Sequence, residues 1–280
     1  PSLLTLSQES QSRMDQVESA PSVATPQMPR LYVCRHGERI DFIDHTWWHR
    51  SNRPFDPHLS PHGYQQASHL ADRLKAEPDT SHIKHILCSP YVRCIETIYP
   101  FATANKIPIK IEHGLAEWFG SETVVQEIHY PLSTAELHEK FPLVDVEYAS
   151  KFEIEAKALG ELDVHQRLYE VAQYVTNTFY KPSAYNGDVM LVTHAAGVIA
   201  AVRGVLALKT QPQTLTPNWY APGGPGRVHV YAGVSCFHKL SQSEPNEYHD
   251  WDYSKSESSS SLLDPQRDYD WAYRPDRSKM

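Results

Sequence analysis

Short apolar segments of strand type alternate with segments of helical period through the middle of this chain. Residues 31–34, 83–88 and 187–193 are largely apolar runs, which is typical of strands buried in a sheet. Residues 107–111 alternate between apolar and other side chains and include Pro108, which favours a strand at a sheet edge. Strands that alternate with helices are typical of parallel sheets. The pattern therefore predicts an α/β fold of three layers, α/β/α, in which helices cover both faces of a mostly parallel central sheet.

Four helices are predicted beside these strands. Ser60 is suited to be an N-cap and Pro61 a first helical residue, so a helix is expected to begin there and to run to about Ala76. Residues 91–104 are of helical type, and Pro100 is expected to break or kink this helix. The remaining expectations are helices over 164–179 and 195–208, and one or two strands within 227–240.

The composition of the two ends sets the expected limits of the domain. The chain has 280 residues and a formal net charge of −8. Residues 1–29 are rich in Ser, Gln and Pro without a helical or strand period, so they are predicted to be disordered. Residues 241–280 hold nine acidic and five basic side chains around a serine-rich stretch, and are predicted to form a flexible tail. One domain is therefore expected over residues 30–240.

The predicted tail contains a repeated aromatic motif. Asp250-Trp-Asp-Tyr253 recurs as Asp270-Trp-Ala-Tyr273. Tryptophan is unusual in a disordered segment because an exposed indole ring is costly without a partner. One hypothesis is that the tail binds another protein through these motifs. The alternative is that the tail lies back over the domain.

Composition argues against several classes of function. The acidic balance offers no basic footprint for nucleic acid, so no direct binding to it is expected. No run of 18 apolar residues occurs, so no membrane-spanning helix is predicted. The four cysteines form no Cys-x-x-Cys pair, which argues against a zinc site or a disulfide scaffold. Since residues 1–29 also lack a signal-peptide pattern, a cytoplasmic protein is predicted, with the nucleus as an alternative.

Polar residues follow three of the predicted strands at the point where each one ends. Arg35 and His36 come after the first strand, residues 89–93 after the second, and His194 after 187–193. Ligand crevices of open α/β sheets lie beyond the carboxyl ends of the strands, so these residues are expected to meet. Guanidinium groups match phosphate oxygens with forked donors, and a neutral imidazole is a good nucleophile. The sequence thus predicts a site for phosphoryl transfer.

Phosphoryl transfer also needs a proton for the leaving oxygen. Glu117 lies just past the predicted strand at 107–111 and is a candidate acid, because burial and an adjacent phosphate are both expected to raise its pKa. Nearby arginines are expected to lower the pKa of His36 and so keep its imidazole neutral. The alternative for Glu117 is that its carboxylate only caps a turn or pairs with a cation.

Four short blocks occur in order at the predicted strand ends. They are Leu31-Tyr-Val-Cys-Arg-His-Gly-Glu-Arg39, Cys88-Ser-Pro-Tyr-Val-Arg-Cys-Ile-Glu-Thr97, Leu115-Ala-Glu-Trp118 and Val192-Thr-His-Ala-Ala196. In these blocks the chain resembles the histidine phosphatase superfamily, which includes phosphoglycerate mutase. The resemblance covers most of residues 30–240 and implies a phosphoglycerate mutase-like fold.

The resemblance implies a role for each matching position. His36 would be the nucleophile that carries a covalent phosphoryl group, and Glu117 would be the general acid and later the base for water. Arg35 and Arg93 would hold the phosphoryl oxygens, and His194 would complete the phosphate pocket. No metal and no cofactor is implied.

Arg39 indicates one branch of the superfamily. The order Arg-His-Gly-x-Arg at 35–39 is similar to that of the suppressor-of-T-cell-receptor-signalling phosphatases and of a phosphatase-like subunit of an RNA polymerase III transcription factor. In this branch Arg39 would bind substrate. A glycolytic mutase would differ at 38–41, so mutase activity is not expected.

The resemblance leaves the substrate and the partners open. The phosphorylated substrate would be a phosphotyrosine or a small phosphate ester, and a homodimer is compatible with the family. The alternative function is a phosphatase fold that serves as a protein-interaction subunit of a larger, for example transcriptional, complex.

Two long connections are expected near the crevice. Residues 120–160 are predicted to form a helical insertion that acts as a lid, with Ser133 and Glu136 as a capping box. Trp47 and Trp48 lie in the connection between the first strand and the first helix. Two roles are open for them: contact with a substrate ring, or packing of the loop onto the domain.

Overall fold

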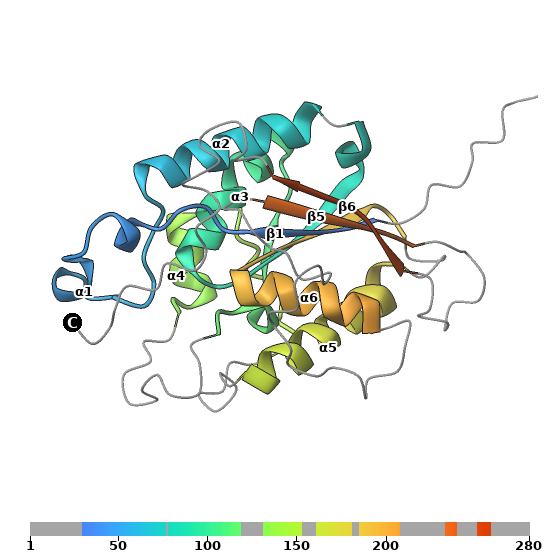
Figure 1. Ribbon diagram of the computed structural model, residues 1–280. Helices are drawn as coiled ribbons and strands as arrows, with labels where there is room; N and C mark the ends of the chain where they lie inside the picture. The colour runs from blue at the N-terminus through green and yellow to red at the C-terminus, as the bar shows by residue number, and fades with distance from the viewer. Residues whose placement is uncertain are drawn as a thin grey trace, which may run out of the picture.

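A six-stranded sheet forms the centre of the molecule (Figure 1). The computed structural model describes residues 30–76, 78–118, 131–152, 161–180, 185–207, 233–239 and 251–258. The strands are β1 (Arg30–Arg35), β2 (Ile83–Cys88), β3 (Ile109–Ile111), β4 (Asp188–Thr193), β5 (Gly233–Lys239) and β6 (Trp251–Ser258). They lie in the order β3-β2-β4-β1-β5-β6, in which the first four pair in parallel and β5 and β6 are antiparallel. The mostly parallel sheet predicted from the sequence is confirmed.

Helices cover both faces of this sheet. They are α1 (Trp47–Arg50), α2 (Pro61–Ala76), α3 (Val92–Asn105), α4 (Thr134–Lys140), α5 (Glu161–Phe179) and α6 (Ala195–Ala207), with short 3-10 turns η1 (Ile40–Phe42), η2 (Pro78–His82) and η3 (His113–Leu115). In Figure 1, α2 and α3 lie above the sheet and α5 and α6 below it, which confirms the three-layer α/β/α architecture. None of the helices in the described part of the chain is long and apolar enough to cross a membrane.

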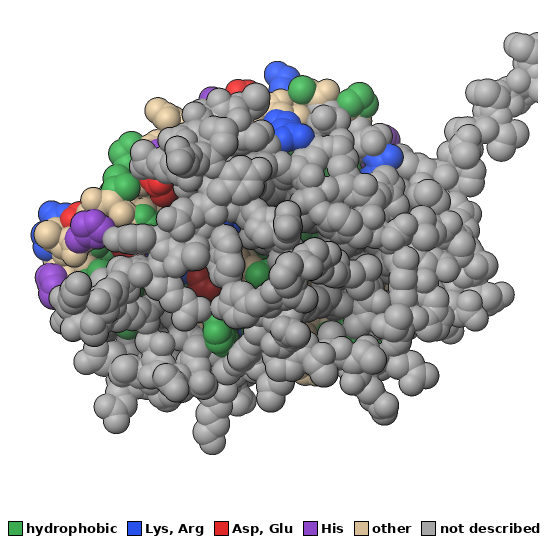
Figure 2. Space-filling model, in the orientation of Figure 1, with side chains coloured by type: hydrophobic (Ala, Val, Ile, Leu, Met, Phe, Trp, Pro, Cys, Tyr) green, Lys and Arg blue, Asp and Glu red, His purple; other side chains and the backbone are tan. Residues whose placement is uncertain are grey.

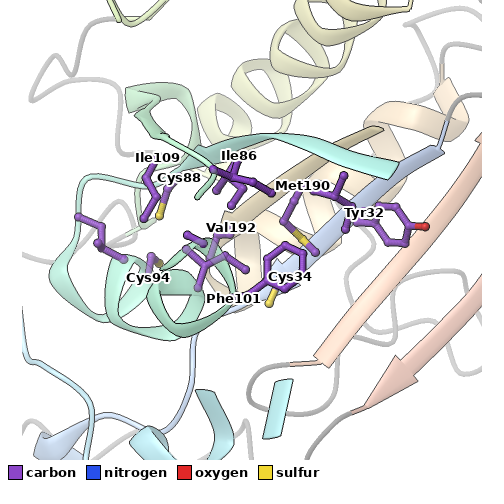
Figure 3. Close-up of a cluster of buried hydrophobic side chains, with 14 of the residues drawn as sticks. Tyr32, Cys34, Ile86, Cys88, Cys94, Phe101, Ile109, Met190 and Val192 are labelled. Carbon is purple, nitrogen blue, oxygen red and sulfur yellow. The ribbon is translucent and has the colours of Figure 1, made fainter. Parts of the chain in front are cut away.

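The two faces of the sheet bury separate apolar cores. Alternate side chains of a strand point to opposite faces, so Leu31 and Val33 of β1 pack with α5 and α6. Tyr32 and Cys34 pack instead with α2 and α3, in the core that Figure 3 shows. All six residues of the central strand β4 are buried. That burial explains why β4 reads as a continuous apolar run rather than as an alternating one.

The predicted elements are present, with one error at Pro100. The hydroxyl of Ser60 accepts from the Gly63 amide at 3.0 Å at the start of α2, which confirms the predicted N-cap, and β3 lies at the sheet edge as expected. Helix α3 runs through Pro100 to Asn105 without interruption, so of the two alternatives the break is wrong, while the kink stays a prediction. Buried residues on both sides of the proline, including Ile98 and Phe101, hold the helix in the core. This packing outweighs the one hydrogen bond that the proline nitrogen cannot donate.

Strand β6 comes from the segment that the sequence analysis assigned to the tail. It pairs antiparallel with β5 over Gly233–Lys239, so the sheet extends past the expected boundary at residue 240. The first aromatic motif therefore contributes Trp251 to Tyr253 to a strand, while its second copy lies outside the described residues. The segment 1–29 also lies outside them, and its predicted disorder stays a prediction.

The described part of the 120–160 segment packs at the edge of the sheet. Ser133 and Glu136 form the predicted capping box at the start of α4. Leu137 of α4 and Val144 are buried in the core that contains α2 and α3, and Val144 bridges to Ile109 of β3. This segment covers the outer side of β3. Residues 119–130 and 153–160 are outside the described part of the chain, so the lid stays a prediction.

The N-terminus of α2 presses against the loop that follows β1. Gly63 lies so close to this loop that a Cβ added to it would stand 2.2 Å from the carbonyl oxygen of Glu38. The Ser60 hydroxyl donates to the Glu38 carboxylate at 2.6 Å, and the Ser60 amide donates to the Glu38 carbonyl at 2.8 Å. Gly37 in turn donates its amide to the Thr97 hydroxyl of α3 at 2.9 Å. The residues just after β1 are therefore fixed between two helices.

Gly63→Ala is expected to destabilise the fold, although alanine usually stabilises a helix interior. The gain in helix propensity is at most about 1 kcal/mol, whereas forcing a methyl group into packed backbone costs about 1–3 kcal/mol. Urea unfolding measures the difference, with Ser68→Ala at an exposed position of α2 as the control. A Gly63→Ala protein as stable as the Ser68→Ala protein would contradict the close approach.

Candidate active site

Two residues extend the hydrogen-bond pattern of the sheet by one position at its carboxyl edge. The His36 amide donates to the Thr193 carbonyl at 3.0 Å, and the Ser89 amide donates to the Val192 carbonyl at 2.9 Å. Because β4 lies between β1 and β2, these bonds place His36 and Ser89 on either side of His194. The structure therefore confirms that the residues at these strand ends meet.

The two histidines lie side by side in the interior. Their ring centroids are 5.3 Å apart with the planes tilted by 59°, and the exposed fractions are 2% for His36 and 0% for His194. Nδ1 of His36 is 2.7 Å from the Gly37 carbonyl oxygen. A carbonyl only accepts, so Nδ1 carries the proton and Nε2 keeps its lone pair. His36 thus presents a nucleophilic nitrogen of fixed orientation.

Glu117 sets the protonation pattern of the second histidine. Its Oε2 lies 3.3 Å from Nδ1 of His194. A carboxylate oxygen only accepts, so Nδ1 carries the ring proton and Nε2 keeps its lone pair. Nε2 lies 2.8 Å from the Ser89 hydroxyl, which donates to it. His194 is therefore held between Glu117 and Ser89.

Arg93 is the most deeply buried charge beside the two histidines. Its side chain is 1% exposed, with Nη2 3.1 Å from Oε2 of Glu117 and Nη1 3.8 Å from Oδ1 of Asp56. Oδ1 of Asp56 also accepts from the Val92 amide at 2.9 Å, at the first residue of α3. The Arg93 guanidinium lies 4.8 Å from the ring centre of Tyr91. Arg93 is therefore held from two sides by carboxylates.

Burial and positive charge keep both imidazoles neutral. Burial lowers the pKa of His36 well below its usual value, and the charges of Arg93 and Arg35 add to this effect. Burial also lowers the pKa of His194 to about 4, where Arg93 acts in the same direction and Glu117 against it. The expectation of a neutral His36 at pH 7 is confirmed.

The pKa of Glu117 moves in the direction opposite to the one expected. Burial alone would raise it, but His194 and Arg93 outweigh burial and hold the pKa of the carboxyl well below its usual range. The expectation of a raised pKa is therefore wrong for the free protein. That expectation considered burial but not the positive charge of Arg93, whose Nη2 lies 3.1 Å from Oε2 of Glu117.

The other two predicted arginines also lie close enough to His36 for their charges to lower its pKa. Arg35 ends β1, is 3% exposed, and is close enough to lower the pKa of His36. Arg39 is farther out, and its guanidinium pairs with the Asp41 carboxylate through bonds of 2.9 and 2.7 Å. It also lies 4.5 Å from the ring centre of Phe42. The structure thus brings five of the six predicted residues into one cluster, which is buried except for the partly exposed Glu117, and places Arg39 at its rim.

The loop with α1 is held together by its own aromatic side chains. Trp47 donates to the Pro54 carbonyl at 3.1 Å and packs edge-on against His58, and Trp48 packs edge-on against Phe55. These contacts lie within the loop itself, so packing of the loop onto the domain and contact with a substrate ring both stay predictions. At the α1 end of the face in Figure 2, hydrophobic, histidine and basic side chains are mixed.

His36, Glu117 and His194 are also the one group in the described part of the chain whose ligand atoms, all within 4.8 Å, could hold a metal ion. Two buried guanidinium groups stand beside this group, and their charge favours an anion over a cation. The donor set therefore fits a phosphoryl group better than a metal. The thiol of Cys94 lies 3.6 Å from Nε2 of His194, but burial raises its pKa strongly, so it is not a competing nucleophile.

No individual role was predicted for the residues that support this cluster. Ser89 and Tyr91 lie in a block that was singled out, and their place next to Arg93 was the available signal. Asp56 lies in a proline-rich connection and Arg167 in an amphipathic helix. Nothing in the local pattern sets either of these two apart from a surface residue.

Residues 31–217 match the histidine phosphatase superfamily (branch 1). The chain belongs to this superfamily. Its relatives include the transcription factor tau 55 kDa subunit of Saccharomyces cerevisiae, which is 27% identical over 194 residues, or 67% of this chain and 43% of the relative. They also include the mouse ubiquitin-associated and SH3 domain-containing protein B, which is 26% identical over 226 residues, or 66% and 33%. This superfamily member thus spans less than half the length of these two relatives.

Two solved structures of phosphatases share the fold. The ecdysone phosphate phosphatase of Bombix mori in complex with tungstate has a TM-score of 0.61 at 22% identity, covering 81% of this chain and 92% of that one. A mycobacterial glucosyl-3-phosphoglycerate phosphatase with VO3 has a TM-score of 0.51 at 18% identity, covering 82% and 99%. These likenesses support the phosphoglycerate mutase-like α/β architecture.

Asp56→Asn is expected to destabilise the protein, because it removes one carboxylate from the buried guanidinium of Arg93. Breaking a buried pair from one side costs about 3 kcal/mol. Urea unfolding at neutral pH measures the loss, with the exposed Asp72→Asn on α2 as the matched change. Equal stabilities of the two variants would show that Asp56 does not support Arg93.

Proposed function

We propose that this histidine phosphatase superfamily member is a phosphomonoester hydrolase that works without a metal, through a covalent phosphohistidine on His36. The observation that carries the proposal is the buried cluster itself. A neutral imidazole with its Nε2 lone pair free of the ring proton stands beside two guanidinium groups and a carboxylate. Phosphoryl transfer needs these three elements: a nucleophile, charge stabilisation for the oxygens, and a proton carrier.

In the first step Nε2 of His36 attacks phosphorus. Arg35 and Arg93 hold the phosphoryl oxygens, and His194 completes the pocket. The bond from phosphorus to the leaving oxygen breaks, and that oxygen takes a proton from Glu117. Since Glu117 is ionised in the free protein, its proton enters with the substrate, which transfers it as a phosphate monoanion on binding.

In the second step water attacks phosphorus of the phosphohistidine. Its proton passes to the carboxylate of Glu117, the nitrogen–phosphorus bond breaks, and the electron pair returns to Nε2 of His36. Inorganic phosphate takes this proton from Glu117 and leaves as the monoanion, which restores the free site with Glu117 ionised. Arg39, held by Asp41 at the rim, would contact the substrate beyond its phosphoryl group.

The substrate is a phosphomonoester, and two classes remain as candidates: phosphotyrosine and small phosphate esters. A Drosophila melanogaster relative, 30% identical over 120 residues that make up 32% of this chain and 16% of its own, is an ecdysteroid-phosphate phosphatase. Its name favours esters of larger alcohols within the second class. A panel of phosphotyrosine peptides, sugar phosphates and sterol phosphates separates these substrates.

The expected location of the protein is the cytoplasm, with the nucleus as the alternative.

His36→Ala is expected to abolish hydrolysis of para-nitrophenyl phosphate in EDTA. Removal of a nucleophile should lower kcat by at least about 10³-fold, whereas His45→Ala, at an exposed position, should leave it unchanged. An alkali-stable, acid-labile phosphoryl group on the quenched wild type would identify the intermediate. Turnover by His36→Ala at the wild-type rate would exclude the mechanism.

Glu117→Gln is expected to affect substrates according to their leaving group. Loss of general acid catalysis should lower kcat/KM for an alkyl phosphate by about 10²-fold or more, and much less for para-nitrophenyl phosphate, whose leaving group needs no proton. In the wild type, kcat/KM for the alkyl ester should fall above about pH 6, where phosphate monoesters lose their second proton. Equal losses on both esters would contradict the assignment of Glu117 as the acid.

The second candidate function is that of an interaction subunit, and the match to the yeast transcription factor subunit favours it. A chain of this kind would bind other subunits of a transcription factor through an interface of about 1,200 Å² or more, and would not turn over any ester of the panel although folded. Against it stands the complete cluster of His36, Glu117 and Arg93, which binding to a partner does not require.

A further inference from the structure

The loop that carries Glu117 is fixed at three consecutive residues. The Gly114 amide donates to Oε1 of Glu112 at 3.1 Å. The Leu115 carbonyl accepts from the Thr193 hydroxyl at 2.7 Å, and the Ala116 carbonyl accepts from Nη2 of Arg167 at 3.1 Å. The third bond is made by a guanidinium from a distant part of the chain, and it acts on the residue directly before Glu117.

Arg167 reaches this loop from the middle of α5. Its side chain is buried with 7% exposure, and it spans 51 positions of sequence to Ala116. The helix itself packs closely on the loop, since a Cβ added to Gly114 would stand 2.6 Å from Cγ2 of Val171. The backbone before Glu117 therefore contacts both α5 and the end of β4.

The guanidinium of Arg167 also lies near the site itself. Burial raises the pKa of the Tyr91 phenol, and the charge of Arg167 is among those that oppose this rise. The Tyr91 ring packs edge-on against His194, with centroids 5.5 Å apart. Burying a guanidinium is costly, and an apolar side chain could fill the same volume. A donor at this place therefore has a more specific use than packing.

We infer that Arg167 is a positioning residue for the general acid, which it holds in place through the Ala116 carbonyl. The position of Glu117 is narrow, because one carboxylate oxygen must face both Nη2 of Arg93 at 3.1 Å and Nδ1 of His194 at 3.3 Å. Misplacement of a catalytic group by about 1 Å can cost on the order of 10²-fold in rate. This inference rests on the proposed role of Glu117 as acid.

The test compares an alkyl phosphate with para-nitrophenyl phosphate in the full chain. Arg167→Gln is expected to lower kcat/KM about 10- to 100-fold for the alkyl ester and by less than about 3-fold for the aryl ester. Arg167→Lys keeps a charged donor, so the ratio of kcat/KM between the alkyl and the aryl ester should change in the same direction but by less. Gln166→Ala, at the exposed neighbouring position, is the control and should match the wild type. The ratio of the two esters does not depend on the fraction of folded protein.

A double-mutant cycle identifies the route of the effect. In a Glu117→Gln background, Arg167→Gln should cost less than about 3-fold more on the alkyl ester, because the acid it positions is already lost. Two results would overturn the inference. One is a double variant in which the losses in kcat/KM from the two substitutions multiply fully. The other is a ratio of kcat/KM between the alkyl and the aryl ester that equals the wild-type ratio in both Arg167 variants. If Arg167→Gln does not fold, the ratio for Arg167→Lys decides. Failure of the proposed function would give a different result, in which His36→Ala or Glu117→Gln hydrolyses the two esters as the wild type does.

Discussion

The buried guanidinium of Arg93 is the constraint on which the rest of the site depends. A cation that is 1% exposed is tolerated only if the fold brings opposite charge to it. Asp56 comes from the connection before α2, and Glu117 from the turn after β3. Two segments far apart in the sequence are therefore held against the first turn of α3 by one charge. The same charge, together with Arg35, sets the chemistry of the pocket.

The electrostatics of the free site prepare the nucleophile but not the acid. The arginines and burial keep His36 and His194 neutral, so the attacking lone pair is available at neutral pH. His194 and Arg93 together hold the pKa of Glu117 well below its usual range and keep it ionised. In the proposed mechanism a phosphate monoanion resolves this conflict, because it would deliver its own proton to the carboxylate and then bind the arginines as a dianion. The arrangement therefore suits a substrate that carries both a charge and a proton.

The elements and most of the site could be predicted because they depend on local pattern. Buried strands are apolar runs, and the polar residues that end them, such as His36 and His194, had to meet at the carboxyl edge. Asp56 and Arg167 could not be found, since each acts on a residue from another part of the chain and sits in a pattern typical of a surface. The sign of the pKa shift of Glu117 failed for the same reason. Strand β6 was missed because its serine-rich sequence has little apolar alternation, and its pairing with β5 depends on the whole sheet.

The cost of burying these charges bears on the choice between enzyme and interaction subunit. A buried ionic cluster is weak support for stability, because apolar residues of similar volume often replace it without loss. A chain that used this fold only to bind partners would gain nothing from burying Arg93 and Arg167. It would gain nothing either from a carboxylate held close to two neutral histidines. Each feature is useful where a phosphoryl group enters the pocket, since the arginines then meet an anion and the carboxylate a proton. The physical cost of the cluster therefore favours a working phosphatase.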